Sequence, residues 1–151
     1  MEKIKVIGWD VYGTLISTKP DEATDDETEE TLKVKARQGA LETLIAVREK
    51  GIIQCTVSDG DLGNLKANLK EAGISREFFD DLYLMQWGLP KDYSVVLDAY
   101  KIKPRQLLII GDSYERDIMP ALQQGCLALW VPEFFNSQSQ NMDIRKFLSQ
   151  I

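Results

Sequence analysis

A length of 151 residues, with 44% hydrophobic and 28% charged residues, is typical of one ordinary globular domain. The sequence has no histidine, which excludes histidine-based catalytic triads, zinc sites and proton shuttles. The net charge is −6 and there is no basic stripe, so nucleic acid is not an expected partner.

Signals for a membrane or for export are also missing from the sequence. No run approaches the roughly 18 apolar residues of a membrane helix, and the start, MEKIKVIGWD, lacks the apolar core of a signal peptide. Cys55 and Cys126 each lie inside an apolar run, as buried thiols do. We therefore expect a protein of the reducing cytoplasm that contacts no membrane.

Predicted strands and helices alternate along the chain. The predicted strands lie at 3–9, 52–57, 82–85, 106–110 and 127–131. Between and after them we expect a helix from about 32 that ends at Gly51, a helix over 62–72, a helix with Pro90 in its first turn, a helix over 117–124 and a terminal helix over 142–151. The strands are apolar without alternation, which predicts an α/β protein with a mainly parallel sheet covered on both faces.

Three polar residues follow directly on predicted strands. Asp10, Ser58 and Asp112 each lie just past a strand's carboxyl end. In parallel α/β sheets the ligand binds at that edge, so we expect these side chains to converge on one site.

The motifs around these residues resemble those of the haloacid dehalogenase-like superfamily. DVYGTL at 10–15, TVSDG at 56–60 and IIGDSYERD at 109–117 are similar to three of its four motifs, in the right order. The resemblance extends from Lys3 to Val131. It implies a Rossmann-like three-layer α/β sandwich, an aspartate nucleophile and, usually, Mg²⁺.

The resemblance also implies a role for each matched residue. Asp10 would attack phosphorus to form an aspartyl-phosphate, which divides one difficult displacement into two easier ones. Asp10 and Asp112 would hold Mg²⁺ together with the main-chain carbonyl of Tyr12, and Asp117 would support the metal through water or hydrogen bonds. The residues expected to bind the phosphate are Thr14, Ser58, Asp59 and Gly60.

Tyr12 departs from the pattern of the family's phosphatases, which usually have an aspartate there as general acid and base. A phenol with a pKa of about 10 can donate a proton but is a poor base at neutral pH, so we expect slow turnover. L-2-haloacid dehalogenases do carry tyrosine, in a DxYGTL motif, and Asp117 could then activate water. However, only 48 residues separate Asp10 from Ser58, too few for a dehalogenase cap, and Asp112 is of the phosphatase type.

The third motif, normally a lysine as in KPxP, also departs from the pattern. Aligning Pro90 and Tyr93 with it puts Trp87 in the place of the lysine. Lys91 lies one residue beyond Pro90, and two interpretations stay open. It is either the catalytic cation or a solvated residue in the first turn of a helix.

Residues 21–30, DEATDDETEE, hold seven acids and no base and predict a solvated loop. We expect one core domain over 1–151, with this acidic loop at about 17–33 in place of a cap. The favoured function is a Mg²⁺-dependent phosphatase acting on a phosphorylated small molecule or a phosphoprotein. The alternatives are a 2-haloacid dehalogenase and a non-catalytic protein whose acidic loop binds a basic partner; a homo-oligomer is also open.

Overall fold

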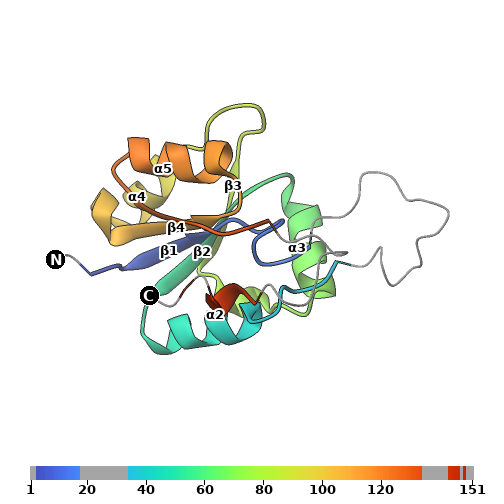
Figure 1. The fold of residues 1–151 in the computed structure, drawn as a ribbon. Helices are drawn as coiled ribbons and strands as arrows, with labels where there is room; N and C mark the ends of the chain where they lie inside the picture. The colour runs from blue at the N-terminus through green and yellow to red at the C-terminus, as the bar shows by residue number, and fades with distance from the viewer. Residues whose placement is uncertain (1–2, 18–33, 134–142, 147, 149–151) are drawn as a thin grey trace.

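The computed structural model describes residues 3–17, 34–133, 143–146 and 148. Its centre is a parallel sheet of five strands in the order β3-β2-β1-β4-β5 (Figure 1). The strands are β1 (Val6–Trp9), β2 (Ile53–Asp59), β3 (Asp81–Met85), β4 (Leu107–Gly111) and β5 (Leu127–Trp130). This arrangement confirms the predicted Rossmann-like α/β fold.

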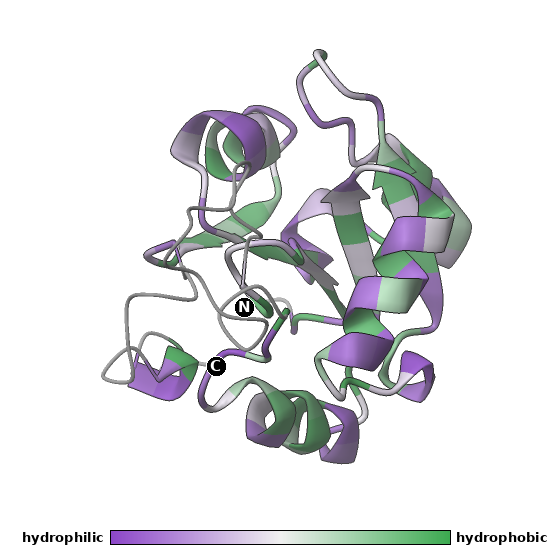
Figure 2. Ribbon diagram, turned by 90° about the vertical axis from the view of Figure 1, so that its right-hand side faces the viewer, coloured by the Kyte–Doolittle hydropathy of each residue, from purple (hydrophilic) through white to green (hydrophobic). Residues whose placement is uncertain are grey.

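Helices cover both faces of the sheet, because side chains of each central strand point alternately to opposite sides. Ile7 and Trp9 of β1 belong to the core beneath α2 (Ala40–Glu49) and α3 (Leu62–Glu71). Val6 belongs to the core on the other face, beneath α4 (Ser94–Tyr100) and α5 (Met119–Gln123). The hydrophobic residues accordingly gather at the sheet and on the inner sides of the helices (Figure 2).

A buried polar side chain ties the central strands to helix α2. Gln54 on β2 accepts a hydrogen bond from Trp9 Nε1 at 2.9 Å and donates one to the carbonyl of Leu44 at 3.0 Å. All three groups lie in the core, where an unpaired polar atom is costly. Gln54 therefore fixes how α2 sits on β1 and β2.

Some predicted boundaries are corrected by the structure. Strand β1 starts at Val6 rather than Lys3, and helix α4 starts at Ser94, so Pro90 lies in the preceding loop and not in a first helical turn. The predicted helix over 117–124 is divided into η3 (Tyr114–Ile118), a π-helical turn, and α5. Pro120 has no N–H, which makes this place unsuited to one continuous α-helix.

Other predictions fall on residues that the structure does not describe. The acidic stretch 21–30 lies outside the described residues, as does half of the predicted terminal helix. Of the latter, Ile144–Lys146 form a 3₁₀ turn, η4. Among the described residues, no helix is both long and apolar enough to span a bilayer.

We predict that Gln54→Leu lowers the free energy of unfolding by about 1–3 kcal/mol, because it leaves the buried N–H of the Trp9 ring without an acceptor. Urea denaturation followed by tryptophan fluorescence measures the effect. Gln123→Leu, the same change on the exposed side of α5, should stay within about 0.5 kcal/mol of the parent. Equal effects for the two variants would contradict a structural role for the Gln54 hydrogen bonds.

Candidate functional site

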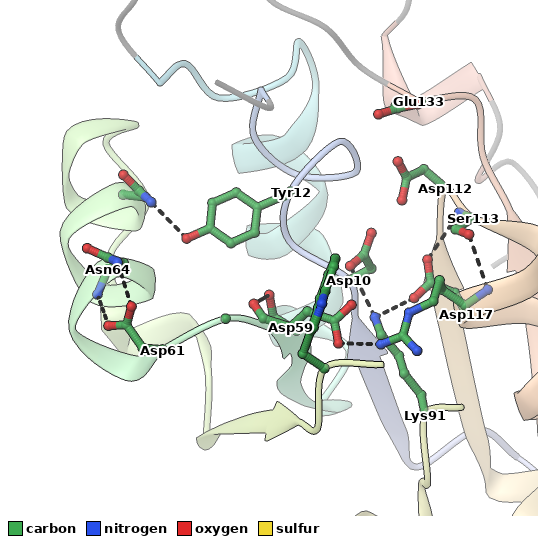
Figure 3. A pocket seen from close by; sticks show the side chains of 15 residues that line it. Asp10, Tyr12, Asp59, Asp61, Asn64, Lys91, Asp112, Ser113, Asp117 and Glu133 are labelled. Atoms are coloured by element: carbon green, nitrogen blue, oxygen red, sulfur yellow. Dashed lines mark hydrogen bonds and ion pairs between the residues drawn. The ribbon is translucent and has the colours of Figure 1, made fainter. Parts of the chain in front are cut away.

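A cavity of about 730 Å³ opens at the carboxyl edge of the sheet (Figure 3). Its lining comes from the ends of β1, β2 and β4, from the loop before α4, from η3 and from one side of α3. The lining residues are Asp10, Tyr12, Ser58, Asp59, Gly60, Asp61, Asn64, Asn68, Trp87, Lys91, Asp112, Ser113, Arg116, Asp117 and Glu133. The expected convergence of Asp10, Ser58 and Asp112 is therefore present.

Asp10 follows β1 at the start of a tight turn. Its backbone N–H donates to the carbonyl of Ile110, and the residue is only 7% exposed. The Thr14 hydroxyl donates to Asp10 Oδ2 at 2.9 Å, which fixes the rotation of the carboxylate. Thr14 itself is fully buried and does not line the cavity, so the structure places it behind Asp10 and not at the expected phosphate position.

Gly13 lets this turn approach the end of β4. Its φ of 80° is in the left-handed region, and a Cβ atom there would overlap the carboxylate of Asp112. The glycine of the DVYGTL motif therefore allows the first and fourth motifs to come together.

Lys91 supplies a buried cation to this site. Its side chain is 1% exposed, and Nζ lies 3.3 Å from Asp10 Oδ1 and forms a close ion pair with Asp117. Nζ also donates to the carbonyl of Val57 at 2.8 Å. Of the two interpretations left open by the sequence, the structure supports the one in which Lys91 reaches the site.

The backbone on both sides of Lys91 is held in place. Gln124 accepts from the Tyr93 N–H at 2.7 Å and donates to the Lys91 carbonyl at 2.8 Å. The Tyr93 hydroxyl donates to the carbonyl of Asp117 at 3.0 Å. Trp87, which aligns with the family's lysine, is 81% exposed on the cavity rim and cannot supply the cation that the family has at this position.

Asp117 projects from the π-helical turn η3, an element often found at functional sites. One carboxylate oxygen accepts from Lys91 and the other from the Ser113 N–H at 3.1 Å. A Cβ atom at Gly111 would overlap this side chain, so the glycine of the GDS sequence makes room for Asp117.

The acids outnumber the cation, and this imbalance governs the electrostatics. Burial raises the pKa of Asp112 to about 9, assisted by its hydrogen bond with Asp10 and by the neighbouring charges. Burial and the charge of Asp10 raise the pKa of Asp117 to about 6, although Lys91 acts in the opposite direction. Burial disfavours the Lys91 ammonium, but Asp10 and Asp117 outweigh it and raise its pKa.

These three acids form the group best suited to a metal ion. Asp10, Asp112 and Asp117 each offer a carboxylate oxygen, and these atoms lie within 4.8 Å of one another. Carboxylate oxygens are hard ligands of the kind that Mg²⁺ prefers. A divalent cation here would favour the ionised form of Asp112, whose pKa is raised by burial and by the neighbouring acids.

Tyr12 lies between this cluster and helix α3 (Figure 3). Its hydroxyl accepts a hydrogen bond at 2.7 Å from the side-chain amide of Asn68. The phenol is thereby directed towards the helix, on the side of the cavity away from Asp117.

The second motif lies at the end of β2. The Ser58 hydroxyl donates to the carbonyl of Asp59 at 3.0 Å, and Gly60 takes a φ of 107°. Asp59 pairs with Arg116 at 2.5 Å, which joins the second motif to the fourth. Ser58, Asp59 and Gly60 all line the cavity, as expected of phosphate-binding candidates.

Seven lining residues were not predicted from the sequence to be part of the site: Asp61, Asn64, Asn68, Trp87, Ser113, Arg116 and Glu133. Ser113 and Arg116 were recognisable, since they lie within the IIGDSYERD stretch, and the guanidinium of Arg116 lies 5.9 Å from the Trp87 ring. Asp61, Asn64, Asn68 and Glu133 carry no motif signal.

The fold and the site together define a class of protein. It is a Rossmann-like α/β protein with three clustered carboxylates, suited to a metal ion, at the carboxyl edge of its sheet. A family model described as haloacid dehalogenase-like hydrolase matches residues 21–125. The chain therefore belongs to the haloacid dehalogenase-like hydrolases. No curated protein matches the sequence significantly.

Solved structures with a similar fold span nearly the whole chain. A HAD-superfamily hydrolase from Ehrlichia chaffeensis is 18% identical with a TM-score of 0.70, covering 99% of this chain and 98% of that one. An uncharacterized protein from Listeria monocytogenes serotype 4b is 24% identical with a TM-score of 0.69, and the match covers 92% of this chain and 86% of that one. A predicted phosphoglycolate phosphatase from Haemophilus somnus 129pt is 18% identical with a TM-score of 0.69, and the match covers 91% of this chain and 90% of that one. At these identities the likeness establishes the fold alone.

We predict that Lys91→Met lowers the free energy of unfolding of the metal-free protein by about 3–5 kcal/mol near neutral pH, because buried carboxylates lose their cation. The deficit should shrink towards about pH 5, since the variant raises the pKa of Asp117 further and protonation then removes the unpaired charge. Urea denaturation in a chelator at the two pH values measures this. Lys66→Met, on the exposed side of α3, is the control and should change the free energy of unfolding little at either pH. An equal deficit of Lys91→Met at both pH values would contradict the electrostatic explanation.

Proposed function

We propose that the protein hydrolyses phosphate esters with Mg²⁺, through an aspartyl-phosphate on Asp10. The observation that carries this proposal is the buried contact of Lys91 with both Asp10 and Asp117 at the edge of an open cavity. A lysine that neutralises part of the charge on the nucleophile is what an attack on an anionic phosphate requires.

In this reaction Asp10 attacks phosphorus, forming an O–P bond while the bond to the leaving alkoxide breaks. Thr14 holds the attacking carboxylate in one orientation, and Lys91 offsets repulsion between the carboxylate and the phosphate. Water then attacks the phosphorus of the aspartyl-phosphate, which releases inorganic phosphate and regenerates Asp10.

The residues present fit Mg²⁺. Asp10, Asp112 and the main-chain carbonyl of Tyr12 would hold the ion, which when bound offsets negative charge on the phosphoryl oxygens. Both oxygens of Asp117 already accept from Lys91 and Ser113, so Asp117 would support the site from behind. Ser58, Asp59 and Gly60 would contact the phosphate from the second motif, with Arg116 holding Asp59 in place.

Tyr12 makes both halves of this reaction slow. Its hydroxyl is directed to Asn68, and a phenol is a poor base for activating water at neutral pH. The aspartyl-phosphate should therefore persist longer than in relatives with an aspartate at this position.

The two alternatives have less support. A dehalogenase would not need a metal-binding aspartate at position 112, whereas Asp112 lies with Asp10 and Asp117 in one cluster of carboxylates. A non-catalytic binding protein would not need a lysine buried against the nucleophile. The predicted phosphoglycolate phosphatase from Haemophilus somnus 129pt, of similar fold, also favours phosphate chemistry.

The domain organisation forms part of the same proposal. One core domain over 1–151, with the acidic loop at about 17–33 in place of a cap, would leave the site open to a phosphorylated small molecule or a phosphoprotein. The acidic stretch 21–30 would also suit a basic protein partner in the cytoplasm.

We predict that the protein hydrolyses an aryl phosphate only when Mg²⁺ is present, and that Asp10→Asn abolishes this activity. Release of the aryl alcohol measures it, with a chelator as the metal-free control. Activity that survives in Asp10→Asn would contradict the nucleophilic role of Asp10. No activity together with halide release from a 2-halo acid would favour the dehalogenase.

We also predict that Tyr12→Asp raises the turnover number by about tenfold or more, since a positioned carboxylic acid typically contributes at least about a hundredfold to proton transfer. Steady-state kinetics with the same aryl phosphate measures the change. Tyr12→Phe removes only the hydroxyl and should not raise the rate. An unchanged rate in Tyr12→Asp would place the limiting step elsewhere.

A further inference from the structure

The cavity holds far more negative than positive charge. Only two of the described lining residues are cations, and both are engaged: Lys91 by Asp10 and Asp117, and Arg116 by Asp59. The lining carboxylates number six: Asp10, Asp59, Asp61, Asp112, Asp117 and Glu133. Even with a divalent ion bound, a substrate bearing a second anion besides its phosphate would meet net repulsion.

The wall formed by helix α3 is rich in hydrogen-bond acceptors. Asp61 caps the helix, accepting from the Asn64 N–H at 2.9 Å and from its side-chain amide at 2.5 Å. The Asn68 amide N–H₂ donates to Tyr12. Each amide donates one N–H to the protein and keeps a second N–H and its carbonyl oxygen, and the two carbonyl oxygens together with the carboxylate of Asp61 give the wall an excess of acceptors and a negative charge.

This wall lies across the cavity from Lys91, Asp112 and Asp117, with the Tyr12 side chain between them (Figure 3). In the proposed reaction the leaving alcohol would occupy this part of the cavity. An ammonium group has three N–H donors, no acceptor and a positive charge, and so matches both the hydrogen-bonding character and the charge of the wall.

Resting on the phosphate-ester hydrolysis proposed above, we propose that the substrate is the phosphate monoester of an amino alcohol, whose ammonium group is recognised by Asp61 and the carbonyl oxygens of Asn64 and Asn68. A neutral hydroxylated alcohol fits less well, and an alcohol that carries a carboxylate is disfavoured by charge. This selectivity is opposite to that expected for phosphoglycolate.

Three esters test the inference: 2-aminoethyl phosphate, 2-hydroxyethyl phosphate and 2-phosphoglycolate. Their leaving alcohols share a two-carbon skeleton and differ in the group at its far end. We expect kcat/KM with Mg²⁺ to fall in that order, with about a tenfold or larger difference between the first and the last. Phosphoglycolate hydrolysed as well as the amino ester would overturn the inference while leaving the phosphatase proposal intact. Failure to hydrolyse these esters and the aryl phosphate alike would overturn the proposed function itself.

Asp61→Asn tests the wall directly, because asparagine caps a helix as well as aspartate does and only the charge is lost. The ratio of kcat/KM for the amino ester to that for phosphoglycolate should fall by about threefold to tenfold. Asp98→Asn, an exposed carboxylate on α4 that does not line the cavity, should leave the ratio unchanged. An unchanged ratio in Asp61→Asn, with the fold intact by circular dichroism, would overturn the role of Asp61.

Discussion

The ion pairs of Lys91 are the interaction on which the site depends. Its ammonium joins the end of β1 to the π-helical turn η3 and also contacts the carbonyl of Val57 on β2. Without it, Asp10 and Asp117 would lie close together in a largely dry environment with nothing to offset their repulsion. Other features of the site bring this cation and these acids together. Gly13 and Gly111 allow the chain segments to approach closely, and the hydrogen bonds of Gln124 hold the backbone around Lys91.

Much of the fold could be predicted from the sequence because it rests on local patterns. Continuous apolar runs such as QLLII identify buried parallel strands, and the residues that follow them must meet at one edge. That reasoning placed Asp10, Ser58 and Asp112 together without any structure. It also gave the ends of α2 and α3, which stop at Glu49 and Glu71 just before Gly51 and Gly73, since glycine stops are local signals. The start of α2 was predicted wrongly, at about residue 32 instead of Ala40.

The parts that escaped prediction depend on contacts between distant residues. The position of Lys91 relative to Asp10 is set by the loop after β3 and by Gln124, neither of which a motif describes. Pro90 suggested a helix start that the chain delays to Ser94. The direction of the Tyr12 side chain follows from Asn68, a residue 56 positions away on a helix that carries none of the matched motifs.

The position of β1 at the centre of the sheet has a consequence for how the site comes into being. Val6 pairs with Ile53 on one side and with Leu107 on the other, and Lys91 meets Asp10 across 81 residues of chain. Contacts of such large separation form slowly, because much chain entropy is lost before they become favourable. Asp10 therefore remains an ordinary solvated aspartate until both halves of the sheet have assembled around it, and its reactivity is a property of the finished fold alone.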